Sequence, residues 1–84
     1  MNDKKENRVK IEICGQIYIL KGSEPEEYMQ DLAKYVDDKI KQVQNRNPKL
    51  SLDKAAVLAA INITDELKKL KVSYDELVDM IEGK

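Results

Sequence analysis

Apolar residues recur at alternating steps of three and four along the second half of the chain. The repeat comprises Ala56, Ala60, Ile63, Leu67, Leu70, Tyr74, Leu77 and Ile81. A helix with this spacing carries a narrow apolar seam that repeats about every 3.5 residues, as in a coiled coil. One helix cannot hide such a seam, and the rest of the chain is too small to cover it. We therefore expect these residues to form an oligomer interface, with another copy of the chain or with a partner helix.

The helix that carries the seam is predicted to begin after Ser51 as N-cap and to continue to about Glu82, where Gly83 ends it. Such a helix is about 45 Å long, which exceeds the diameter of a compact domain of this size. Its first turns, residues 55–61, are apolar all round, so we expect them to be buried on several sides.

The charges beside the seam bear on how two such helices would pair. With Leu67 at heptad position a, Glu66 occupies position g and Lys71 the following position e. This arrangement predicts an interhelical ion pair in a parallel two-stranded coil. Antiparallel packing remains open.

Polar and apolar residues alternate near the N-terminus, which predicts two strands of a hairpin. Gly15 and Gln16 are predicted as the central residues of a type II′ turn, which pairs Ile13 with Tyr18. One face then carries Val9, Ile11, Ile13, Tyr18 and Leu20, and the other carries Lys10, Glu12, Cys14, Ile17 and Ile19. We expect Ile17 and Ile19 either to be covered by a second subunit or to remain as a small apolar patch.

A first helix is predicted after the hairpin, with Ser23 and Glu26 as its capping box and an end near Asn45. Its predicted apolar face comprises Tyr28, Leu32, Tyr35, Val36, Ile40 and Val43. We expect this face to cover the hairpin. The predicted fold class is therefore α+β and oligomeric: a tail over residues 1–7, a ββα head over 8–50, and a long helix over 51–84.

The composition favours a protein that assembles and argues against an enzyme or a metal site. The chain has 84 residues, one cysteine and no histidine, so His-based metal sites and His general bases are excluded. Cys14 is interpreted as a small core or sheet residue. We find no phosphate-binding glycine loop and no nucleophile–base pair, and predict no enzyme activity, cofactor or metal. No secretory or membrane-spanning stretch is recognised, which favours a cytoplasmic protein without membrane insertion.

The charge is unevenly distributed. The net charge is −1, which argues against a general nucleic-acid binder, but residues 39–52 contain several basic residues and no acid until Asp53. Such a stretch is either a solvated face or a docking surface for an acidic partner. The candidate docking residues are Lys39, Arg46 and Lys49, with Lys41 and Lys54 as weaker candidates.

Three segments resemble the ZapA family of bacterial cell-division proteins. They are the hairpin around residues 13–16, the segment 36–40, and the segment 59–67, which is the most specific. The resemblance covers residues 8–82. It implies a ββα head on a long helix, dimers or tetramers, a position at the mid-cell division ring, and binding to FtsZ, the tubulin-like GTPase whose filaments family members cross-link. By the same resemblance, the basic residues of the head are the candidates for contacting FtsZ.

Two other functions fit parts of the pattern. A small DNA-binding dimer of the strand-helix-helix type would place a basic strand or helix in the major groove, although the outward strand residues here are Arg8, Lys10 and Glu12. A structural adaptor would use the seam to recruit an unrelated helix.

Overall fold

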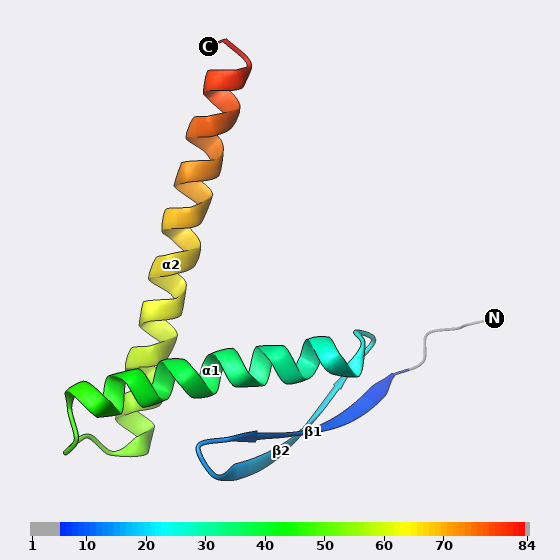
Figure 1. Cartoon of the computed structure of the whole chain (residues 1–84), viewed down its shortest axis with the longest axis vertical. Coiled ribbons are helices and arrows are strands. Elements are labelled where there is room, and N and C mark those ends of the chain that lie inside the picture. The colour runs from blue at the N-terminus through cyan, green and yellow to red at the C-terminus, as the bar shows by residue number, and fades with distance from the viewer. Residues whose placement is uncertain (1–5, 84) are drawn as a thin grey trace.

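The computed structural model describes residues 6–83, so most of the predicted tail lies outside the described residues. Strands β1 (Asn7–Ile13) and β2 (Gln16–Gly22) form an antiparallel hairpin, α1 (Glu26–Arg46) lies over it, and α2 (Leu52–Ile81) leaves the far end of α1 (Figure 1). The predicted α+β arrangement of a ββα head and a long helix is confirmed.

The chain has the shape of an L. Its extents are 49 × 49 × 15 Å and its radius of gyration is 17.2 Å, against about 12 Å for a compact domain of this length. The excess arises because α2 contacts α1 through about its first four turns, as far as Glu66, and then continues away from the head (Figure 1).

The hairpin has a different turn from the one predicted. Cys14 and Gly15 are its central residues, with φ of 49° and 81°, as a type I′ turn requires. Ile13 therefore pairs with Gln16 and Ile11 with Tyr18, so the predicted pairing of Ile13 with Tyr18 is wrong by two residues. Because side chains alternate with a period of two, a shift of two residues leaves the paired side chains on their predicted faces. Cys14 is the exception, because it lies in the turn and packs against the cluster between α1 and α2, not on the outer face of the hairpin.

Two small clusters make up the core. Between the hairpin and α1, the buried residues are Val9, Ile11, Met29 and Ala33. Between α1 and the start of α2, they are Ile40, Val43, Ala55 and Ala59. Ile13 packs against both clusters and so links the hairpin to the helix pair.

The start of α1 corrects the predicted capping box. Pro25 is the N-cap, its conformation is extended, and no side chain caps the helix. A residue that precedes proline is disfavoured in the helical region, so Glu24 cannot form the first turn that a cap at Ser23 requires. At α2 the prediction is confirmed, because the Ser51 hydroxyl accepts a hydrogen bond from the Lys54 backbone N–H at 3.3 Å.

The buried face of α1 is rotated from the predicted one. Val36, Ile40 and Val43 do face inward, but Tyr28, Leu32 and Tyr35 remain about half exposed. Met29 and Ala33 contact the hairpin in their place. Similarly, only Ala55 and Ala59 of the apolar segment 55–61 are buried within one chain, so burial on several sides is not reached without a partner.

Candidate partner-binding surfaces

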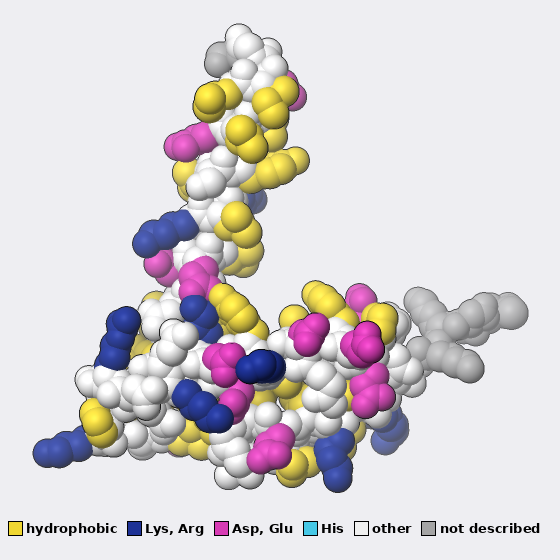
Figure 2. Space-filling model, viewed as in Figure 1, with side chains coloured by type: hydrophobic (Ala, Val, Ile, Leu, Met, Phe, Trp, Pro, Cys, Tyr) yellow, Lys and Arg dark blue, Asp and Glu magenta, His cyan; other side chains and the backbone are white. Residues whose placement is uncertain are grey.

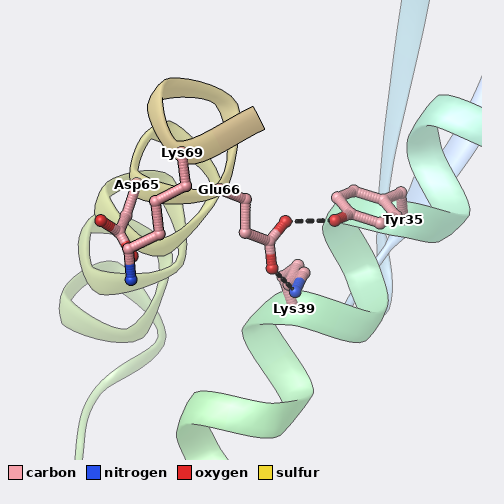
Figure 3. Close-up of polar contacts among 5 residues, drawn as sticks. All are labelled: Tyr35, Lys39, Asp65, Glu66 and Lys69. Atoms are coloured by element: carbon pink, nitrogen blue, oxygen red, sulfur yellow. Dashed lines mark hydrogen bonds and ion pairs between the residues drawn. The ribbon is translucent and has the colours of Figure 1, made fainter. Parts of the chain in front are cut away.

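The five basic residues predicted to form one docking surface fall into two groups. Lys39 lies between α1 and α2, where its ammonium forms an ion pair with Glu66 and lies 5.2 Å from the centre of the Tyr35 ring. The Tyr35 hydroxyl donates to the other oxygen of Glu66 (Figure 3). The Lys39 side chain is only 16% exposed, so it serves first to join the two helices.

The three side chains of this junction shift one another's ionisation. Hydrogen bonding from Lys39, and then from Tyr35, lowers the pKa of Glu66. The Glu66 carboxylate in turn raises the pKa of Lys39 by accepting a hydrogen bond from its ammonium. It raises the pKa of Tyr35 in the same way, by accepting a hydrogen bond from its hydroxyl. Glu66 was predicted to pair with Lys71 of a neighbouring helix, but both its oxygens are occupied within the chain. Lys39 and Tyr35 lie 27 and 31 positions from Glu66 along the chain, so no local sequence pattern predicts these contacts.

Lys41 takes part in a second internal connection. Its ammonium lies 2.8 Å from Asp37, whose carboxylate also accepts the Cys14 backbone N–H at 2.7 Å. Hydrogen bonding from Lys41, and then from Cys14, lowers the pKa of Asp37. Burial, followed by the hydrogen bond to Asp37, raises the pKa of the Cys14 thiol. These contacts hold the hairpin turn, in which Cys14 has a positive φ, against α1.

Arg46, Lys49 and Lys54 form the second group, at the outer corner where α1 turns into α2. All three residues are exposed, and the ion pairs within residues 6–83 use other lysines. Dark-blue side chains lie around this corner at the left of Figure 2. A shallow hollow at the turn is lined by Arg46, Asn47, Pro48, Lys49 and Leu50.

The seam forms a separate surface on α2. Ala56 and Ile63 are partly buried, whereas Ala60, Leu67, Leu70, Tyr74, Leu77 and Ile81 are exposed in the single chain. Tyr28, Leu32 and Tyr35 are exposed at helical spacing on α1, and the Tyr35 hydroxyl reaches Glu66 of α2. Figure 2 shows hydrophobic side chains on the right-hand side of α2 and on the upper side of α1, the two sides of the inner angle of the L.

Ile17 and Ile19 form a third exposed apolar group. They lie opposite Glu12 and Lys10 on the face of the hairpin away from α1, and each is more than half exposed. They are exposed in the single chain, and whether a second subunit covers them stays a prediction.

This architecture coincides with a known family. Residues 9–83 match the family model described as "Cell division protein ZapA". The chain is 43% identical over 77 residues to a "Cell division protein ZapA" of Geobacillus thermodenitrificans (strain NG80-2), covering 92% of this chain and 85% of that protein. The chain belongs to the ZapA family. A ZapA of Geobacillus sp. (strain WCH70) is 38% identical over 81 residues, covering 96% of this chain and 93% of its own.

A solved ZapA structure has the same fold. The "ZapA mutant dimer from Geobacillus stearothermophilus" matches with a TM-score of 0.76 and 34% identity, over 98% of this chain and 95% of that one. The membership predicted from residues 13–16, 36–40 and 59–67 is confirmed. Within the described part of the chain, neither helix is both long and apolar enough to cross a membrane.

Proposed function

We propose that this chain is a non-enzymatic cell-division protein that self-associates and cross-links FtsZ filaments at the mid-cell division ring, in the cytoplasm. The observation that carries the proposal is an apolar seam left exposed along α2 in a chain of the ZapA family. The related protein of known structure is described as a dimer, which supports the same assembly here.

The inner angle of the L is the proposed oligomer interface. Burying apolar surface contributes roughly 25 cal/mol per Å², and the seam presents Leu67, Leu70, Tyr74, Leu77 and Ile81 on one helical face. A second copy standing against this face would also rest on Tyr28, Leu32 and Tyr35 of α1. We propose a homodimer first, with a homotetramer as a further association through the arms.

Cross-linking follows from symmetry. A dimer carries every surface twice, and a second weak contact with a filament becomes effectively intramolecular once the first has formed. We propose Arg46, Lys49 and Lys54 as the principal FtsZ-contacting residues, because they face solvent on the outer corner. Lys39 and Lys41 take a lesser part, because each already has an internal acidic partner.

Co-sedimentation with FtsZ and GTP, followed by electron microscopy, tests the proposal. Wild-type protein should increase the pelleted FtsZ and produce bundles. The Arg46→Glu/Lys49→Glu variant should bundle several-fold less FtsZ while remaining dimeric. Its control is Lys10→Glu/Lys21→Glu, which makes the same change of charge on the exposed hairpin.

The outcomes separate the site from the function. If wild-type protein fails to bundle FtsZ, the proposed function is wrong. If both double variants bundle like wild type, the function stands and the assignment of the corner is wrong. A loss that is equal in both variants would show only a general effect of charge and would also reject the corner.

A further inference from the structure

The outer corner of the L contains an apolar floor as well as basic side chains. Leu50, Val57 and Leu58, with Asp53 and Lys54, line a hollow of about 360 Å³ whose surface is almost wholly apolar. Val57 is 60% exposed and Leu58 40% exposed. The hollow adjoins the one at the turn through Leu50, and a third through Leu58, so the three form one continuous surface.

This surface is distinct from the seam. Successive helical residues are rotated by about 100°, which places Leu58 about 150° and Val57 about 110° from the centre of the seam. A helix seated on the seam would therefore leave the floor uncovered. Leu50 precedes the helix and lies on the same outer side.

The charges around the floor are mainly positive. Arg46 and Lys49 border it from the turn, and Lys54 lines it directly. The one acid in its lining is Asp53, which lies in the first turn of α2, where a negative charge is favoured by the helix dipole. Three cations and one anion around an apolar surface favour an acidic occupant with apolar side chains.

We propose that the outer corner binds a short acidic, amphipathic peptide segment of a protein partner, with apolar side chains on Leu50, Val57 and Leu58 and carboxylates on Arg46, Lys49 and Lys54. The inference deepens the proposed function, because it names the chemistry that the corner recognises. A nucleic-acid backbone would satisfy the cations but leave the apolar floor unused. The apolar contacts would supply affinity and the charges would supply orientation and a fast encounter.

Fluorescence anisotropy with labelled synthetic peptides tests this inference on the full chain. The probe carries two leucines one helical turn apart among glutamates, and a companion peptide of the same charge has both leucines replaced by serine. The wild-type chain should bind the first peptide at least about tenfold more tightly, since each buried aliphatic side chain contributes about 1.5–3 kcal/mol. Raising the salt concentration should weaken the binding of both peptides.

The chain supplies a matched pair of variants. Val57→Ser removes an apolar side chain from the floor, whereas Val72→Ser removes one from α2 outside the floor, at 55% exposure against 60% for Val57. Both sites are exposed in the single chain, so each variant should fold. We expect Val57→Ser to bind the leucine peptide about fivefold to tenfold more weakly and Val72→Ser to bind it like wild type.

Several results would overturn the inference. Equal binding of the two peptides would reduce the site to a basic patch, and full competition by random duplex DNA would make a nucleic acid the better occupant. A lower assembly mass for Val57→Ser by light scattering would show that a second copy covers the floor.

Unchanged FtsZ bundling by this variant, with wild type active, would reject the corner as the FtsZ contact while leaving the proposed function intact. Conversely, leucine-dependent peptide binding by a chain that cannot bundle FtsZ would support the inference and reject the function.

Discussion

The head and the arm of this molecule differ in how far their apolar side chains are buried within one chain. The head comprises the hairpin, α1 and the first turns of α2, and its buried residues contact one another within the chain. The arm, residues 67–81, exposes its large apolar side chains along the seam. The head therefore has a core within one chain, whereas the arm has none and is expected to pair with a second helix.

Because of this difference, the stability of the head comes from folding and that of the arm is expected to come from assembly. An isolated helix as short as the arm, about 15 residues, is marginal in water. The buried residues of α2, Ala55 and Ala59, lie near its other end. Closure of the head should not depend on protein concentration. The helicity of the arm should depend on it, because pairing stabilises by mass action.

The largest effect is expected from opening the core of the head. Ile11→Ala should lower the free energy of unfolding by about 2–5 kcal/mol, because it removes a buried side chain and leaves a cavity, and Ile11 is 4% exposed. Ile81→Ala, the same change at 75% exposure in the single chain, should cost less than about 1 kcal/mol when both variants are measured at a dilution that keeps the chain monomeric. Chemical denaturation followed by circular dichroism measures both. Equal costs would mean that the arm is packed as firmly as the head.

The second effect is expected at the seam and should appear in assembly. Leu70→Glu places a charge on the seam, and should weaken self-association by at least about 100-fold, because a carboxylate replaces a buried leucine in both copies. Val72→Glu introduces the same charge two residues away, off the seam, and should leave the mass unchanged. Light scattering over a dilution series separates the two variants. If both lose their dimers, the interface surrounds the arm; if neither does, the seam is not the interface.

Local patterns were predictable from the sequence, whereas contacts between distant segments were not. The seam, the Ser51 cap and the alternating strands are local patterns, and the structure contains each of them. The faces of the hairpin were also predictable although its turn was not, because a two-residue shift preserves them. That shift arose because Cys14 adopts a positive φ, which few residues other than glycine do, with Asp37 of α1 as its hydrogen-bond partner.

The remaining errors concern contacts between distant segments. Periodicity favoured the large side chains Tyr28, Leu32 and Tyr35 as the buried face of α1, but the hairpin packs on Met29 and Ala33. Which stripe faces inward depends on where the hairpin lies, and no spacing within α1 contains that information. The internal partner of Lys39 was unpredictable for the same reason, since Glu66 lies 27 positions away along the chain.

The smallest effect is expected at the junction where the arm leaves the head, and it should depend on pH. The pKa of Glu66 is lowered from its ordinary value of 4.5 by Lys39 and Tyr35, so its carboxylate stabilises the folded chain above that value. This contribution should be lost as the pH falls through the lowered pKa of the folded state. Glu66→Gln keeps the shape of the side chain and removes the charge, so the variant should be slightly less stable than wild type at neutral pH.

A neighbouring residue provides the control for this prediction. Asp65 pairs with Lys69 at 3.0 Å on the exposed side of α2, with both side chains more than half exposed (Figure 3), and exposed pairs one helical turn apart contribute little. Asp65→Asn makes the same change of charge, yet should leave the unfolding midpoint near that of wild type at neutral pH. Thermal unfolding of all three proteins between neutral and acidic pH measures the effect. The gap between wild type and Glu66→Gln should close on acidification, because the wild-type carboxylate becomes neutral as well. A gap that persists at acidic pH would show that packing of the side chain, and not its charge, joins the arm to the head.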